Sequence, residues 1–177
     1  MFYDETKVYL KAGDGGHGCM SFLRQKYMPA GGPDGGNGGR GGNVVLQADE
    51  NVSDLRAFHF KKHWKAKNGQ PGRGTDQNGR MGEGCLLKLP LGTQVRVSDE
   101  EDLFCELLAH GEEIVLLEGG KGGRGNATFK SSVNQTPRQT TEGKPGEDGD
   151  FVFTLKTIAD VGLVGFPNAG KSTLLNV

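Results

Sequence analysis

Short runs in which apolar and polar residues alternate recur along the chain as far as about Thr157. Residues 151–155 (FVFTL) are an example. Successive side chains of an extended chain point to opposite faces, so this period fits a half-buried strand. No segment before Thr157 has convincing helical periodicity, and the nearest candidate is a short turn around residues 53–58. We therefore predict a mainly β first domain with strands at 7–11, 19–24, 43–48, 86–89, 94–97, 103–108, 112–117 and 150–155.

Glycine clusters separate these runs, and the chain holds 31 glycines but only 7 prolines. Residues 31–42 carry two glycines in every triplet, and three residues is the period of the polyproline II helix. Such segments could pack backbone against backbone, whereas glycine-rich segments elsewhere are often flexible linkers. We favour packing, because the clusters recur between strands and contain Arg, Asn and Asp rather than Ser. Weaker clusters lie at 13–18, 69–84, 119–125 and 143–149.

Composition places the chain among cytoplasmic proteins with reduced thiols. Hydrophobic residues make up 34% of the sequence and charged residues 24%, and no apolar stretch approaches the roughly 20 residues of a membrane helix. The first residues lack the basic and apolar regions of a signal peptide. Cys19, Cys85 and Cys105 are widely spaced without a CxxC pair, which disfavours a zinc or redox site. We expect a cytoplasmic monomer without a membrane span.

The formal net charge of -1 conceals an uneven distribution. Residues 99–118 carry acidic side chains and no Lys or Arg, whereas the glycine-rich segments carry cations that could neutralise RNA phosphates. Two alternatives remain: the cations only keep the surface soluble, or the acidic segment docks a basic protein. That segment could also be a solvated strand edge. The candidate RNA contacts are Arg40, Arg73, Arg80, Lys121 and Arg124.

Aromatic and cationic residues alternate in residues 58–67 (FHFKKHWKAK). This composition suits base stacking, but it equally suits a strand or hairpin with its aromatic side chains inward. We favour the structural interpretation, with Phe58, Phe60 and Trp64 in the core. His59 and His63 have no third ligand nearby, so we do not predict zinc.

The pattern changes after Ile158, where an apolar run at 161–164 precedes Gly165–Ser172. These eight residues match G-x-x-x-x-G-K-[ST] at every fixed position. In such a loop the glycines allow close backbone approach, and the N–H groups surround phosphate oxygens. Lys171 would reach the β- and γ-phosphates, and the Ser172 hydroxyl would bind Mg²⁺. The sequence therefore predicts a nucleotide-binding loop between a strand and a helix.

Together, residues 159–172 (ADVGLVGFPNAGKS) and the glycine-rich part before them resemble the Obg family of GTPases. Further resemblance lies at 13–18 (GDGGHG), 24–27 (RQKY), 61–66 (KKHWKA) and 119–126 (GGKGGRGN). The resemblance implies an Obg fold over residues 1–158, which is mainly β with glycine-rich polyproline II helices. Residues 159–177 would then be the first strand and phosphate loop (P-loop) of an α/β P-loop GTPase domain.

The resemblance also implies a function. Members of the family are Mg²⁺-dependent GTPases that bind GTP and GDP and act in maturation of the large ribosomal subunit and in growth and stress control. Some also bind guanosine tetraphosphate. Their partners are ribosomal RNA and ribosomal proteins, and the alternative for the first domain is a protein-docking module.

Lys171 is the expected catalytic residue and Ser172 the Mg²⁺ ligand. No other GTPase motif is present, so we do not expect these 177 residues to hydrolyse GTP alone. The nucleotide-binding residues carried over are Gly165, Phe166, Pro167, Asn168, Ala169, Gly170, Lys171, Ser172 and Thr173.

Overall fold

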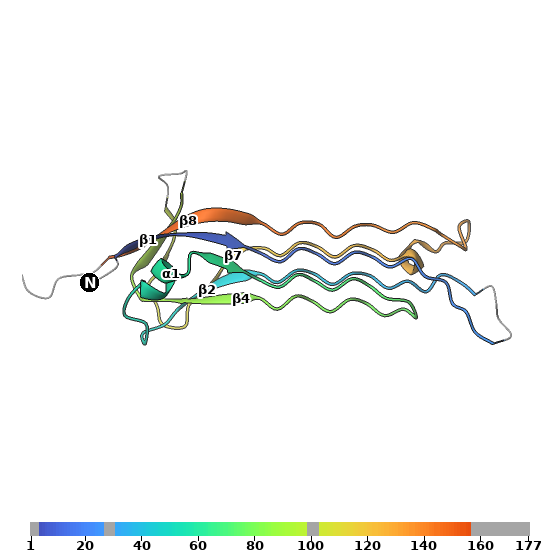
Figure 1. Cartoon of the computed structure of the whole chain (residues 1–177), viewed down its shortest axis with the longest axis horizontal. Coiled ribbons are helices and arrows are strands. Elements are labelled where there is room, and N and C mark those ends of the chain that lie inside the picture. Colours follow the sequence, from blue (N-terminus) through green and yellow to red (C-terminus); the bar gives the residue numbers. More distant parts are fainter. Residues whose placement is uncertain (1–3, 27–30, 99–102, 157–177) are drawn as a thin grey trace, which may run out of the picture.

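A β base at one end of the molecule carries a long arm of extended segments that run side by side (Figure 1). The structure is a computed structural model that describes residues 4–26, 31–98 and 103–156. The predicted start of the GTPase domain, residues 159–177, lies outside these residues. In the described part of the chain, no helix has the length and apolar character that a membrane span requires.

The base contains two sheets. The five-stranded sheet has the order β3-β1-β8-β5-β6 and the three-stranded sheet the order β4-β2-β7. The β1–β3 and β2–β4 pairs are parallel, and the other pairs are antiparallel. The strands are β1 (Glu5–Lys11), β2 (Val44–Ala48), β3 (His63–Lys65), β4 (Cys85–Leu89), β5 (Thr93–Val97), β6 (Leu103–Leu107), β7 (Glu113–Leu117) and β8 (Asp148–Leu155).

The hydrophobic core of the base follows from the alternation in these strands. In β8 the side chains of Phe151 and Phe153 are buried while those between and beside them are more exposed. The Phe58 ring meets that of Phe153 edge-on, with ring centroids 5.4 Å apart. Other core side chains come from both sheets and include Val8, Leu10, Leu46, Leu87, Leu89, Val95 and Leu107. The predicted mainly β character is confirmed.

Two local predictions are wrong. Residues 19–24 form no strand, because they lie in the arm, where only an isolated bridge joins Phe22 to Pro33. Residues 56–60 form a short helix, α1 (Arg56–Phe60), where we expected only a turn. Residues two apart point to nearly opposite sides of a helical turn. Phe58 is therefore 3% exposed, and Phe60, which we expected in the core, is 76% exposed.

The arm consists of six extended segments joined by backbone hydrogen bonds at every third residue. Gly13, Gly16 and Cys19 donate their N–H groups to the carbonyls of Gly42, Gly39 and Gly36. Other pairs of segments repeat this three-residue step, and both parallel and antiparallel neighbours occur. The segments are 13–19, 35–42, 67–73, 77–84, 119–126 and 141–147.

Glycine is required where these segments touch. A Cβ atom on Gly41 would lie within 3.0 Å of the Gly13 carbonyl group and the Asp14 carbonyl oxygen. Real Cβ atoms essentially never approach other atoms this closely. The same holds for many glycines in the arm, so backbone packs directly against backbone. The clusters are thus packed structural segments rather than flexible linkers.

Candidate functional site

The nucleotide-binding residues predicted from the sequence, Gly165–Thr173, lie outside the described residues. Their expected roles, including those of Lys171 and Ser172, stay predictions. Within residues 4–26, 31–98 and 103–156, no group of three His, Cys, Asp or Glu side chains is placed to hold a metal ion. The candidate functional features of the described chain are surface features of the arm and of the two ends of the molecule.

The Arg40 side chain binds other groups of the arm. Its guanidinium donates to the Glu118 carboxylate at 2.8 Å and to the Gly119 carbonyl oxygen at 3.3 Å. The side chain is 38% exposed, and the ion pair joins segment 35–42 to the start of segment 119–126. Because Glu118 partly neutralises its charge, Arg40 attracts an anionic ligand less strongly than the predicted contacts that have no ion-pair partner.

The remaining predicted RNA contacts have exposed side chains that point away from the backbone interior. Among the described residues, no carboxylate forms an ion pair with any of them. Backbone hydrogen bonds place Arg80 and Lys121 along the length of the arm and Arg73 and Arg124 nearer its far end. The structure thus distributes these cations along the length of the arm instead of gathering them at one tip. They are Arg73, Arg80, Lys121 and Arg124.

Two buried polar side chains hold the far end of the arm together. Asn126 is fully buried and accepts the Gly35 N–H at 2.9 Å. Its amide donates to the carbonyl oxygens of Ser21 at 2.8 Å and Pro137 at 3.3 Å. These bonds connect the hairpin that includes residues 19–26 and 31–36 with the hairpin 126–141.

Asp34 connects the first hairpin to a third one. Its carboxylate accepts the Thr75 N–H at 3.0 Å, and its carbonyl oxygen accepts the Asp76 N–H at 2.7 Å. Thr75 and Asp76 have positive φ angles of 58° and 55°, a conformation that non-glycine residues rarely adopt. The carboxylate therefore fixes a tight turn against the rest of the arm.

Further cations at this far end were missed by the sequence reasoning. They occur in a segment that looked like a strand and in an irregular stretch without glycine clusters. The cross-hairpin pairing that brings both segments to the far end has no signature in local sequence. These cations are Arg24, Lys26, Lys130 and Arg138.

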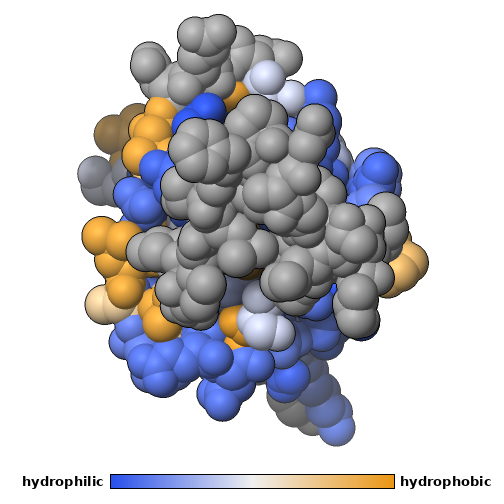
Figure 2. All heavy atoms as spheres, turned by 90° about the vertical axis from the view of Figure 1, so that its left-hand side faces the viewer, coloured by the Kyte–Doolittle hydropathy of each residue, from blue (hydrophilic) through white to orange (hydrophobic). Residues whose placement is uncertain are grey.

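The surface of the base end carries exposed apolar side chains. Figure 2, which views this end, shows hydrophobic side chains in separate groups among hydrophilic ones. Exposed apolar residues of the base include Phe60, Leu86, Leu103, Phe104, Leu108 and Val115.

Two titratable groups of the base have perturbed pKa values. Burial raises the pKa of the Cys105 thiol to about 11, so we expect an unreactive thiol and no redox site. Asp49, beside the Lys88 ammonium at 2.8 Å, has a pKa well below its ordinary value because it accepts hydrogen bonds from Lys88 and Asn51.

Comparison with known proteins agrees with the resemblance seen in the sequence. A family model described as GTP1/OBG matches residues 3–157. The chain is 49% identical over 176 residues to a protein of Persephonella marina named GTPase Obg, covering 99% of this chain and 52% of that relative. It is 51% identical over 177 residues to GTPase Obg of Desulforamulus reducens, covering 100% of this chain and 42% of that relative.

The chain spans about half the length of the curated relatives it matches, such as the 51% covered in GTPase Obg of a Sulfurihydrogenibium species. The family match includes all of the described base and arm. The mainly β base, the glycine-rich arm and these matches together show that the chain belongs to the GTP1/OBG family.

Proposed function

We propose that this chain acts in a GTP-binding protein of the Obg type, in which the arm contacts RNA of the large ribosomal subunit. The observation that carries the RNA contact is the construction of the arm. Its interior is backbone, so long side chains project outward, and exposed Arg and Lys lie along its length. RNA is bound largely through its phosphates, which such cations neutralise.

We further infer that the six segments of the arm are polyproline II helices. Their hydrogen bonds recur at every third residue, which is the number of residues per turn of that helix. Gly125, with φ -77° and ψ 164°, lies close to the polyproline II region. At about 3.1 Å per residue, residues 13–23 would extend roughly 30 Å. This is long enough for a narrow arm to enter a deep groove in a large assembly.

Nucleotide binding is proposed for Gly165–Ser172, supported by the sequence motif and by the names of the relatives. Backbone N–H groups of this loop would hold GTP or GDP phosphates, with Lys171 on the β- and γ-phosphates and Ser172 on Mg²⁺. Mg²⁺, when bound, neutralises charge that develops on the phosphates. We propose a domain boundary near residue 158 and assign GTP hydrolysis, ribosome maturation and growth control to the longer parent protein.

Co-sedimentation with purified large ribosomal subunits tests the RNA contact. The 177-residue chain is mixed with subunits over a series of salt concentrations, and the bound fraction gives the slope of log affinity against log salt. Each lost phosphate contact lowers this slope by about one. We expect Arg73→Gln/Arg124→Gln to bind more weakly and with a slope lower by about two.

Lys7→Gln/Lys65→Gln is the matched control, because it removes the same charge from exposed positions of the base. This variant should bind like the parent. Equal binding by the arm variant and the parent would refute the proposed contact.

A second candidate is protein docking at β6, an edge strand of the five-stranded sheet. Its exposed Leu103 and Phe104, together with Leu108, are apolar side chains beside an acidic segment. Edge strands offer unpaired backbone groups to another chain. In the same sedimentation assay, loss of binding by Phe104→Ser with full binding by the arm variant would favour a ribosomal protein as the partner.

A further inference from the structure

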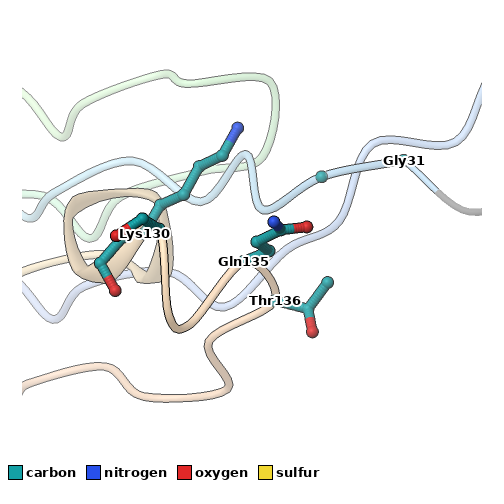
Figure 3. A pocket seen from close by; sticks show the side chains of 7 residues that line it. Gly31, Lys130, Gln135 and Thr136 are labelled. Atoms are coloured by element: carbon teal, nitrogen blue, oxygen red, sulfur yellow. The ribbon is translucent and has the colours of Figure 1, made fainter.

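The far end of the arm contains an open cavity of about 630 Å³ between two hairpins. Gly31 and Gly32 line one side, and the other side comes from residues 130–136. Figure 3 shows Lys130, Gln135 and Thr136 on one segment, with Gly31 on the segment across from them. Its volume lies within the roughly 300–1,000 Å³ typical of small-ligand sites. A single nucleotide is a ligand of suitable size.

The lining offers positive charge and hydrogen-bond donors and contains no carboxylate. Lys130 provides an ammonium group, Ser131, Ser132 and Thr136 provide hydroxyls, and Gln135 provides an amide. Among the described residues, no ion pair or side-chain hydrogen bond engages Lys130, Ser132, Gln135 or Thr136. These groups are exposed to solvent and available to a ligand. The donors favour a phosphate, and the amide can both donate to and accept from a base edge.

Hydrogen bonds of the buried Asn126 side chain and of the exposed segment 130–136 constrain the two walls of the cavity. Asn126 links Ser21 and Gly35, on one hairpin, to Pro137, which follows Thr136 on the other. On the side of residues 130–136, Asn134 donates its N–H to the Ser131 hydroxyl at 3.0 Å. A cavity with fixed walls loses less conformational entropy when it binds a ligand.

We propose that this cavity binds one unpaired nucleotide of a single-stranded RNA segment. Lys130 and the Ser132 hydroxyl would hold its phosphate, and Gln135 and Thr136 would contact its base edge. The proposal rests on the proposed RNA contact and adds to it a defined pocket and the class of RNA. Duplex RNA presents its bases in a stack, whereas loops and ends can extend a base into such a pocket.

A phosphopeptide is the less suitable ligand. Its phosphate would use the same Lys and Ser groups, but a peptide would leave the Gln135 amide and the Thr136 hydroxyl, which match a base edge, without a partner. The exposed cations further along the arm could also bind other phosphates of the same RNA chain, which a peptide with a single phosphate does not have. These two features favour RNA over a singly phosphorylated protein segment.

Gly32 provides a way to place a charge in the cavity without disturbing the arm. A Cβ atom on Gly32 would have one neighbour within 4 Å, the Lys130 ammonium nitrogen at 3.8 Å. Gly32→Asp therefore puts a carboxylate beside Lys130, and Gly32→Asn puts a neutral side chain of the same shape there. Comparing the two variants separates the effect of charge from that of volume.

The test uses the 177-residue chain and fluorescein-labelled RNA hexanucleotides, one each of A, C, G and U, at low salt. Fluorescence anisotropy gives the affinity, and amide chemical shifts in NMR spectra map the contact. We expect shifts at residues 31–32 and 130–136 and at least tenfold weaker binding by Gly32→Asp than by Gly32→Asn. A 12-base-pair RNA duplex should bind more weakly than the hexanucleotides and leave these amides unshifted.

Three outcomes would refute the proposal that the cavity binds a nucleotide. They are no hexanucleotide binding at millimolar concentration, equal RNA affinity of the two Gly32 variants, and amide chemical-shift changes confined to the flanks of the arm. Inorganic phosphate that competes at the same concentration as RNA would also overturn it, by indicating a simple anion site. Co-sedimentation with large ribosomal subunits is measured in parallel. If both Gly32 variants sediment equally while the Arg73→Gln/Arg124→Gln variant does not, the cavity is refuted and the proposed function stands. Hexanucleotide binding in the cavity without sedimentation supports the cavity and refutes the ribosomal partner.

Discussion

Substitution of a single contact glycine should destabilise the arm, and Gly41→Ala is the most informative case. Gly41 is buried between segments 13–19 and 119–126. The new Cβ atom would overlap the Gly13 carbonyl group, and an ordinary contact of 3.4 Å is reached only if the two segments separate. The required movement of about 1.5 Å exceeds what a hydrogen bond tolerates.

The expected cost follows from the bonds that this separation breaks. Gly13 donates its N–H to the Gly42 carbonyl oxygen, and Gly120 donates its N–H to the Gly13 carbonyl oxygen, both at 2.9 Å. A buried polar group left without its partner costs about 1–3 kcal/mol. Loss of these two bonds therefore lowers the free energy of unfolding by roughly 2–6 kcal/mol. For a protein of this size, the melting temperature should fall by roughly 4–24 °C.

Differential scanning calorimetry measures this change, and amide hydrogen exchange at Gly13 and Gly120 locates it. Gly32→Ala is the control, because its Cβ atom would meet no atom closer than 3.8 Å. The control should be neutral or slightly stabilising, since alanine restricts the unfolded chain. A Gly41→Ala protein with the melting temperature and amide protection of the parent would refute the argument that backbone contact makes glycine necessary.

Three further predictions concern buried polar and titratable groups. Asn126→Ala should lower the free energy of unfolding by about 2–4 kcal/mol, because buried partners lose their bonds; unchanged melting and unchanged amide exchange near Gly35 would contradict this. Because the Asp49 pKa is lowered from 3.8, its contribution to stability is present above that pH and lost on acidification below it. Lys88→Met should raise the Asp49 pKa, measured by NMR titration, and should make the protein lose less stability in acid. An unchanged Asp49 titration would contradict the conclusion that the bond from Lys88 lowers this pKa. Burial of the Cys105 thiol, with its pKa at about 11, should slow its alkylation by iodoacetamide at pH 8 at least tenfold relative to the urea-unfolded chain. Equal alkylation rates of Cys105 in the folded and unfolded chain, measured by mass spectrometry, would contradict this prediction.

Local sequence pattern was sufficient for most of the base. Alternation located β2, β4, β5, β6, β7 and β8 to within one or two residues, because these strands bury one face against a common core. It failed for α1, which has a single turn and one buried side chain. A segment that short has no measurable period.

The arm was predicted only in part. Two glycines per triplet in residues 31–42 indicated backbone packing, since the repeat has a direct steric meaning. The number of segments and their partners come from tertiary pairing, such as that between Gly16 and Gly39. That pairing also decides which cations reach the far end. For this reason the sequence did not single out Lys130, and it did not indicate that Arg40 pairs with Glu118.

The three-residue step of the arm restricts how its length can change during evolution. Insertion of one residue in a segment rotates everything beyond it by about 120°, which turns side chains toward neighbouring backbones in place of glycines. Insertion of a triplet restores the rotation but also needs a matching triplet in the adjoining segments, because each segment hydrogen-bonds to several others. Arms of this type should therefore lengthen or shorten in coordinated steps of roughly 9 Å. Single-residue insertions and deletions should be confined to the turns at the far end.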